Sequence, residues 1–234
     1  MKVSAIIVAA GSGTRLGSKE PKAFVEVGGR PLLYYSLRTI REIAPVAEII
    51  VTLPPGKENE ARDTVDRAGL RVPIKLTPGG AERQDSVRIA LSLVSADSML
   101  VLVHDAARPF AGAELFAACI EAAARNGAAI AAMPVADTLK EAAHSIIIAT
   151  RPREGLFAAQ TPQAFRRELL VAGHAQGTAV SMSATDDAFL VERMGNPVEI
   201  VAGSALNFKI TTPEDLRLAR ALIASDPLLA CQFE

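Results

Sequence analysis

Residues 3–22, which read VSAIIVAAGSGTRLGSKEPK, decide the fold of this chain. The apolar run Val3–Val8 predicts a buried β-strand, and the small residues after it predict a loop at the carboxyl end of that strand. Apolar runs of this kind then alternate with helical patterns along the 234 residues. The expected strands are Val3–Val8, Glu48–Leu53, Ile74–Thr77, Met99–His104, Ala128–Pro134 and Pro197–Val201, and the expected helices are Pro31–Glu42, Lys57–Ala68, Gln84–Val94, Gly112–Arg125, Arg166–Ala175, Thr185–Met194 and Pro213–Ala224.

This alternation predicts an α/β protein in which one Rossmann-like, mostly parallel sheet is flanked by helices on both faces. We expect residues 1–234 to form a single domain of this kind. In such sheets ligands bind beyond the carboxyl ends of the strands. The loop after Val8 and the stretch HDAARPF, His104–Phe110, both follow predicted strands, so we expect them to face one cleft.

Residues 135–163 depart from the alternation, and no helical period is visible in them. Ile146–Ala149 has the pattern of one strand of a hairpin, with Asp137–Lys140 expected opposite it. An excursion of this length from a compact sheet is usually functional or forms an interface. We therefore expect a protruding β-hairpin arm within the domain.

Composition excludes several classes of protein. Lys and Arg number 25 against 26 Asp and Glu, so no overall positive field attracts nucleic acid or a membrane surface. The cysteines, Cys119 and Cys231, cannot form a disulfide framework, and we expect both to be structural free thiols of a reducing compartment. The first apolar run leads into a glycine loop rather than a cleavage site, and none approaches the roughly 20 residues that span a bilayer. These features predict a cytoplasmic protein with no nucleic-acid or membrane partner.

The loop in residues 9–22 has the composition of a phosphate-binding site, because glycines let backbone N–H groups close around an anion. It matches neither the Walker A loop nor the dinucleotide fingerprint, since Leu16 stands where each requires a glycine. Arg15 and Lys22 add positive charge that suits a triphosphate whose negative charge grows during reaction. The alternative is a glycine-rich turn that carries solvated surface cations.

The stretch LVLVHDAARPF, residues 100–110, reads as a buried strand that ends at Asp105. A carboxylate at such an end, beside a phosphate loop, suits Mg²⁺, which prefers oxygen ligands and shares substrate phosphates. A structural ion pair between Asp105 and Arg108 is the alternative reading. His104 has no partner at metal-ligand spacing, so we expect it to pack or to hydrogen-bond rather than to catalyse.

Seven segments occur in a characteristic order and spacing: AAGSGTRLGSKEPKAF, GGAERQDSV, VHDAARPF, PVADTLK, QTPQAF, TDDAFLVE and NFKITTPEDL. Together they resemble the 2-C-methyl-D-erythritol 4-phosphate cytidylyltransferase family over about residues 3–224. The resemblance implies transfer of CMP from CTP to 2-C-methyl-D-erythritol 4-phosphate with Mg²⁺, giving 4-diphosphocytidyl-2-C-methyl-D-erythritol and pyrophosphate in non-mevalonate isoprenoid biosynthesis. It also implies a homodimer in which residues 135–163 form an arm that completes the partner's site.

The same resemblance implies roles for individual residues. Catalysis would fall to Arg15 and Lys22, CTP binding to Ala10, Gly11, Gly13, Gly80, Ala81, Arg83, Ser86, Asp105 and Ala106, and methylerythritol phosphate binding to Arg108, Thr138, Arg153, Thr161 and Lys209. Asp105 would contact either the metal or the ribose.

Three residues depart from the family pattern, in which an acidic residue is frequent at each position: Ala81, Pro152 and Leu206. Two other functions stay open at this point. The acceptor could be ribitol-5-phosphate, as in a closely related cytidylyltransferase. The chain could also be a nucleotide-binding protein without catalysis, although keeping Arg15, Lys22 and Asp105 together argues against that, because binding alone would tolerate the loss of one.

Overall fold

The computed structural model describes residues 1–18 and 20–225, and Lys19 and Cys231 lie outside the described residues. A seven-stranded sheet in the order β11-β7-β10-β6-β1-β4-β5 forms the centre of the molecule. Its strands are β1 (Val3–Val8), β4 (Val46–Leu53), β5 (Ile74–Pro78), β6 (Leu100–Asp105), β7 (Ala128–Pro134), β10 (Phe157–Arg166) and β11 (Glu199–Ala202). The strands are parallel except for β10, which is antiparallel to both of its neighbours. The predicted α/β fold is confirmed.

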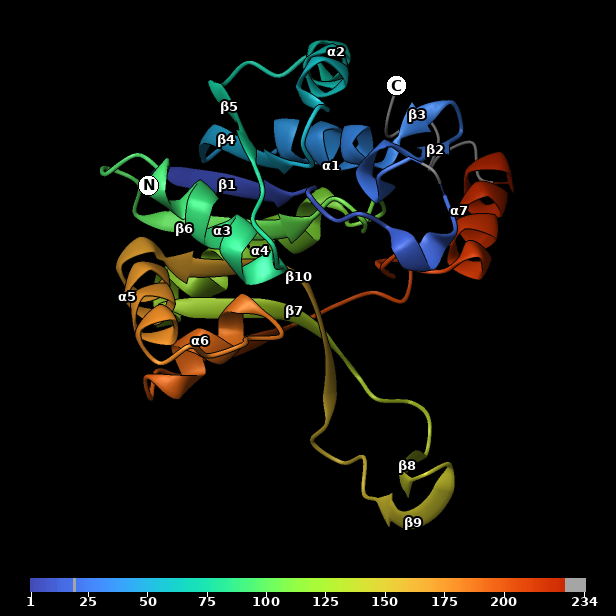
Figure 1. Ribbon diagram of the computed structural model, residues 1–234. Helices are drawn as coiled ribbons and strands as arrows, with labels where there is room; N and C mark the ends of the chain where they lie inside the picture. Colours follow the sequence, from blue (N-terminus) through green and yellow to red (C-terminus); the bar gives the residue numbers. More distant parts are fainter. Residues whose placement is uncertain (19, 226–234) are drawn as a thin grey trace.

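Helices cover both faces of this sheet (Figure 1). The helices are α1 (Leu32–Arg41), α2 (Glu58–Ala68), α3 (Arg83–Ser92), α4 (Ala113–Asn126), α5 (Arg167–Ala179), α6 (Asp187–Arg193) and α7 (Pro213–Ser225). Alternate residues of β1 divide between two cores, as the period of a strand requires. Ala5 and Ile7 pack in the core under α1, α2, α4 and α7, whereas Ile6 packs in the core under α3, α5 and α6.

Short elements shape the chain between β1 and α1. They are the 3-10 turns η1 (Thr14–Leu16) and η2 (Lys22–Phe24) and the two-stranded ladder of β2 (Glu26–Val27) and β3 (Arg30–Pro31). Leu16 and Phe24 are buried in the core, so both turns are anchored to the body of the protein.

Strand β10 corrects the sequence analysis, which expected no strand of the main sheet within residues 135–163 and assigned all of them to the arm. Residues 160–165 are buried, and β10 fills the place between β6 and β7. The sequence signal was masked by Pro162 and by two glutamines that read as loop residues. Gln160 donates to Ser204 O at 3.0 Å and Gln163 donates to Asp186 Oδ2 at 2.9 Å, so the buried amides are satisfied.

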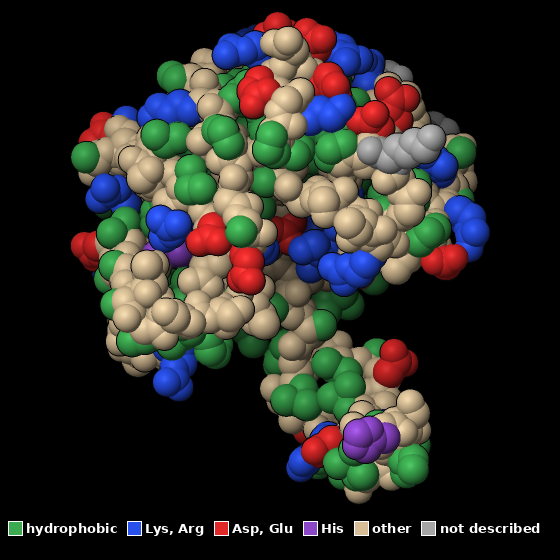
Figure 2. All heavy atoms as spheres, in the orientation of Figure 1, with side chains coloured by type: hydrophobic (Ala, Val, Ile, Leu, Met, Phe, Trp, Pro, Cys, Tyr) green, Lys and Arg blue, Asp and Glu red, His purple; other side chains and the backbone are tan. Residues whose placement is uncertain are grey.

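The arm contains a two-stranded ladder of β8 (Leu139–Ala143) and β9 (Ile146–Arg151) with the residues that flank it, and it stands away from the body of the molecule (Figures 1 and 2). The predicted hairpin exists, but its predicted register is wrong, because Ile146–Ala149 pairs with residues 141–143 rather than 137–140. The two-residue turn at His144 and Ser145, with φ of 48° and 66°, sets this register.

Two further expectations concern thiols and membranes. Cys119 is fully buried on α4, where burial raises the pKa of its thiol to about 12, so its expected structural role is confirmed. Among the described helices, none is both long and apolar enough to cross a membrane.

Candidate active site

The glycine loop begins where β1 ends, and backbone hydrogen bonds fix its start. The Ala9 N–H donates to Thr52 O on the adjacent strand at 3.1 Å. Gly13 has φ of 71°, in the left-handed region that favours glycine. A Cβ added to Gly13 would lie 2.9 Å from Lys22 Cβ. The glycine therefore lets the two ends of the loop meet, which carries Lys22 back over the end of β1.

A second tight turn, residues 79–82, follows β5 and leads into α3. A Cβ on Gly79 would lie 2.2 Å from Ala10 Cβ, so the two loops touch only because this residue is glycine. The Gly80 N–H donates to Ser86 Oγ at 3.0 Å, and that hydroxyl donates to Glu82 O at 3.1 Å. The first turn of α3 thus holds the turn against the glycine loop.

These two loops and the end of β6 enclose a pocket of about 350 Å³. It lies beyond the carboxyl ends of the strands, where the parallel sheet predicts a ligand. The lining residues are Val8, Ala9, Ala10, Gly11, Ser12, Gly13, Thr14, Arg15, Lys22, Ala23, Gly80, Ala81, Glu82, Arg83, Ser86, Asp105, Ala106, Ala107, Lys209 and Thr211. In the space-filling view, basic and acidic side chains meet in a hollow above the arm (Figure 2).

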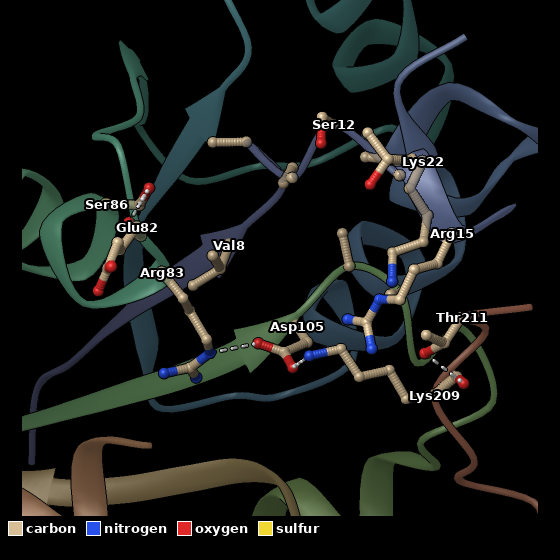
Figure 3. Close-up of a pocket in the computed structure, with 18 of the residues that line it drawn as sticks. Val8, Ser12, Arg15, Lys22, Glu82, Arg83, Ser86, Asp105, Lys209 and Thr211 are labelled. Carbon is tan, nitrogen blue, oxygen red and sulfur yellow. Dashed lines mark hydrogen bonds and ion pairs between the residues drawn. The ribbon is translucent and has the colours of Figure 1, made fainter. Parts of the chain in front are cut away.

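Asp105 lies in the floor of the pocket between two cations (Figure 3). Its Oδ1 accepts from Arg83 Nε at 2.9 Å, and its Oδ2 accepts from Lys209 Nζ at 2.7 Å. Burial opposes the charged form of this 5% exposed carboxyl, but Arg83 and Lys209 together hold its pKa far below the usual range. Asp105 is therefore a carboxylate at every physiological pH.

The alternative ion pair between Asp105 and Arg108 is wrong. Arg108 turns its guanidinium away, donating from Nη1 to Asn207 O at 2.7 Å and from Nη2 to Ala159 O at 3.4 Å. It does not line the pocket. Asp105 instead pairs with Arg83 and Lys209. Because both of these cations line the pocket, the two ion pairs are part of the candidate site.

Lys22 and Arg15 point into the pocket from the glycine loop, facing Lys209 (Figure 3). Burial, followed by repulsion from Lys209 and Arg15, lowers the pKa of the Lys22 ammonium to about 8. Asp105 partly opposes this shift. A site that crowds cations until one of them loses basicity is suited to an anion with several charges.

His104 plays the structural part expected of it. Its Nδ1 lies 3.1 Å from Thr161 Oγ1 and its Nε2 lies 3.2 Å from Arg108 O, while its ring packs against Phe116 with 4.8 Å between centroids. Burial lowers the pKa of this imidazole to about 4, so the ring is neutral at pH 7.

The sequence profile of the 2-C-methyl-D-erythritol 4-phosphate cytidylyltransferase (IspD) family matches residues 3–225. The chain belongs to this family. It is 44% identical over 224 residues to the 2-C-methyl-D-erythritol 4-phosphate cytidylyltransferase of Pelotomaculum thermopropionicum, covering 95% of this chain and 94% of the relative. It is 49% identical over 222 residues to the protein of that name from Deinococcus radiodurans, covering 94% and 89%.

Solved structures of the family have the same fold as this chain. The crystal structure of 2-C-methyl-D-erythritol 4-phosphate cytidylyltransferase from Thermus thermophilus matches with a TM-score of 0.80 and 42% identity, covering 96% of this chain and 100% of that one. The 4-diphosphocytidyl-2C-methyl-D-erythritol synthase of Anaerococcus prevotii matches with a TM-score of 0.85 and 34% identity, covering 95% and 96%. The sheet and its covering helices are therefore those of a cytidylyltransferase.

Most of the residues that the resemblance singled out meet in the pocket, but four do not line it. The predicted catalytic pair, every predicted CTP-binding residue and Lys209 line the pocket. Thr161 is buried beneath it, where its Oγ1 accepts the Asp105 backbone N–H at 3.0 Å. Thr138 and Arg153 are exposed on the arm, and Arg153 donates to Ala136 O. The roles of all these residues stay predictions, including acceptor binding by Arg108, Thr138, Arg153 and Thr161.

Sequence reasoning missed two buried residues behind the pocket, Asp187 and His174. Asp187 accepts from Arg83 Nη1 at 2.7 Å and lies 3.1 Å from His174 Nε2. The motif TDDAFLVE contained a usable signal, because its first aspartate, Asp186, caps α6 by accepting from Phe189 N at 3.0 Å. The aspartate after a cap enters the first turn of the helix, and here it faces the interior.

The described part of the protein offers few oxygen ligands in this pocket, so a magnesium ion fits only if the substrate supplies most of its ligands. Among residues 1–18 and 20–225, no group of three or more His, Cys, Asp or Glu side chains could hold a metal. Asp105 has one hydrogen bond on each oxygen, which leaves a lone pair on each. Phosphate oxygens commonly complete the coordination of Mg²⁺, so Asp105 fits as a single protein ligand.

Proposed function

We propose that this protein transfers CMP from CTP to 2-C-methyl-D-erythritol 4-phosphate in isoprenoid precursor biosynthesis. A phosphate oxygen of the acceptor forms a bond to the α-phosphorus of CTP, the bond from that phosphorus to the bridging oxygen breaks, and pyrophosphate leaves with the electron pair. The observation that carries the proposal is the pocket of a cytidylyltransferase-family chain in which Arg15 and Lys22 of the glycine loop converge with Lys209.

Charge neutralisation is the main task of the site, because a phosphate monoester is already ionised at pH 7 and needs no general base. Catalysis then depends on alignment and on cations near the α-phosphorus. Arg15 and Lys22 would supply those cations, with Ala10, Gly11 and Gly13 as the backbone cradle. Their convergence in one pocket supports these roles.

CTP selection would fall to the turn after β5. Gly80, Ala81 and Ser86 would bind the cytosine with Arg83 nearby, and Asp105 and Ala106 would meet the ribose or the metal. The close contact between Gly79 and Ala10 holds this turn against the glycine loop, which supports one nucleotide site shared by the turn and the loop. Mg²⁺ bound to the triphosphate, with Asp105 as its protein ligand, would neutralise charge on the phosphates.

Acceptor binding would use both the body and the arm. Lys209 lies in the pocket, whereas Thr138 and Arg153 lie on the arm. A homodimer through the arm, in which each arm completes the partner's site, would bring the two groups together. The apolar side chains Ile146, Ile147 and Ile148 are 70%, 61% and 59% exposed, which supports an interface there. A cytoplasmic location belongs to the same proposal, and the free thiol of Cys119 is in keeping with it.

The experiment measures pyrophosphate release with Mg²⁺, 2-C-methyl-D-erythritol 4-phosphate and each of CTP, UTP, ATP and GTP, with ribitol-5-phosphate as the parallel acceptor. Release that requires CTP and 2-C-methyl-D-erythritol 4-phosphate is expected. Arg15→Ala and Lys22→Ala should each lower turnover about 10²–10³-fold. Lys2→Ala is the matched control, because Lys2 pairs with Asp97 on the surface.

Other outcomes would contradict parts of the proposal. Release only with ribitol-5-phosphate would keep the mechanism and change the acceptor. Absence of release with every pair of substrates, in folded protein that binds CTP, would favour a nucleotide-binding protein without catalysis. Near-normal turnover in Lys22→Ala would remove the role assigned to the loop cations.

A further inference from the structure

A chain of hydrogen-bonded polar groups runs from the pocket floor to helices α5 and α6. Arg83 joins Asp105 and Asp187, donating from Nε at 2.9 Å to the first and from Nη1 at 2.7 Å to the second. Asp187 is only 1% exposed and does not line the pocket. Behind it, His174 Nε2 lies 3.1 Å from the other Asp187 oxygen and is 2% exposed.

This geometry fixes the Arg83 guanidinium at two separate points. Because the group is planar, hydrogen bonds from two different nitrogens to carboxylates on two different elements set both its position and its rotation. Asp105 comes from the end of β6 and Asp187 from the first turn of α6, so neither carboxylate can follow a displacement of the other. In Figure 3 the Arg83 side chain reaches across the pocket floor to Asp105.

The charges explain why a second carboxylate matters. The single negative charge of Asp105 is shared between two positive charges, those of Arg83 and Lys209. Asp187 supplies the second negative charge, so that Arg83 need not be neutralised by Asp105 alone. Without the Asp187 charge, Arg83 would draw Asp105 more strongly or turn toward an anion in the pocket, since its Nη2 is buried without a hydrogen-bond partner among the described residues.

We propose that Asp187 is a positioning residue for CTP binding, which acts by holding Arg83 in the orientation that presents Asp105 to the nucleotide. His174 supports Asp187 from the far side. This inference rests on the proposed placement of CTP in the pocket.

The first test compares Asp187→Asn with Asp186→Asn. Both changes replace a carboxylate by an amide at the start of α6, but Asp186 caps the helix and does not touch Arg83. Asn is as good a helix cap as Asp. We expect Asp187→Asn to raise the KM for CTP and the calorimetric Kd for CTP at least about tenfold. This is the lower end of the roughly 10–100-fold loss of affinity that follows when a metal-binding side chain loses the residue that orients it. The KM for 2-C-methyl-D-erythritol 4-phosphate should change little.

A role in folding alone would give a different pattern. Destabilised protein has a smaller active fraction, which lowers the apparent kcat and leaves the KM for CTP unchanged. Asp186→Asn should keep the wild-type KM for CTP even if its melting temperature falls. An unchanged KM and Kd for CTP in folded Asp187→Asn would overturn the proposal.

A double-mutant cycle with Arg83→Gln tests whether Asp187 acts through Arg83. If it does, Asp187→Asn in the Arg83→Gln background should change the KM for CTP less than about twofold, because the interaction is already lost. A full tenfold effect in that background would overturn the proposal. An unchanged KM for CTP in Arg83→Gln alone would instead contradict the proposed CTP site itself.

Should Asp187→Asn fail to fold, Asp187→Glu keeps the charge and moves the carboxylate by one methylene. The same double-mutant cycle then applies. The proposal is supported if Asp187→Glu raises the Kd for CTP in the wild-type background and no longer does so in the Arg83→Gln background. It is contradicted if folded Asp187→Glu has the wild-type Kd for CTP while Arg83→Gln weakens CTP binding.

Discussion

The lowered pKa of Lys22 predicts an alkaline limit to activity well below that of an ordinary lysine. Burial, with repulsion from Lys209 and Arg15, brings this pKa to about 8 instead of 10.5. At pH 7 roughly nine-tenths of the free enzyme therefore carries the charged ammonium, and at pH 9 only about one-tenth does. If the charged form is needed, kcat/KM for CTP should be nearly constant up to about pH 7 and should fall to about half near pH 8. Above about pH 9 the fall should approach tenfold per pH unit.

The assay is the initial rate of pyrophosphate release at low CTP from pH 6.5 to pH 10, because kcat/KM reports the ionisation of the free enzyme. Lys22→Arg is the control, since a guanidinium stays charged over this range. Whatever activity this variant retains should not fall near pH 8. A wild-type profile that stays flat to pH 10, or a Lys22→Arg profile that falls at the same pH as the wild type, would refute the reasoning.

The same shift has a consequence for stability. A lysine whose pKa is lower in the folded than in the unfolded state destabilises the fold while it is protonated, so the stability of the protein should rise between pH 8 and pH 10.5. Lys22→Met keeps the aliphatic stem and removes the charge. It should raise the free energy of unfolding at pH 7 by about 1–2 kcal/mol, after solvent screening reduces a limit of about 3 kcal/mol, while turnover falls. Urea unfolding would measure the change, and a less stable Lys22→Met protein would contradict it.

Three other perturbations have outcomes fixed by the structure. Gly79→Ala places a Cβ 2.2 Å from Ala10 Cβ and should weaken CTP binding at least about tenfold by calorimetry, whereas Gly112→Ala meets nothing within 4 Å and should bind normally. The Asp105 pKa lies far below the unfolded value of 3.8, so the stabilisation that this group contributes falls by about 1.4 kcal/mol per pH unit below pH 4. In Asp105→Asn the free energy of unfolding should therefore depend less steeply on pH in this range. Ile147→Asp on the arm should leave the monomer fold intact by circular dichroism and abolish the dimer in sedimentation velocity.

The observations that would contradict these predictions are specific. Normal CTP affinity in Gly79→Ala would mean that the two loops separate without cost. An acid-unfolding slope unchanged by Asp105→Asn would mean that the carboxylate gains little from Arg83 and Lys209. A dimer that survives Ile147→Asp would move the interface away from the exposed face of the arm.

Local sequence patterns determined the parallel part of the fold. Apolar runs such as Val3–Val8 and Leu100–Val103 are long enough to mark buried strands, and caps and periodicity mark the helices between them. The pattern failed at β10, where Pro162 and two glutamines imitate a loop. Their amides are hydrogen-bonded to Ser204 and Asp186, which are distant in sequence. Local sequence patterns cannot predict these partners, so the two glutamines could not be identified as buried strand residues.

The sequence by itself determined that this chain is an α/β protein with a phosphate loop, an acidic strand end and the motifs of a cytidylyltransferase. Those properties depend on residue types and short spacings, which a single chain displays directly. Only the tertiary structure decided which charges meet: Asp105 pairs with Lys209 rather than with Arg108, and Arg83 connects it to Asp187, 104 positions away from Arg83. Pairing of this kind depends on which elements the sheet order brings together. The sequence around a charged side chain does not indicate its partner, because that partner comes close only when the chain has folded.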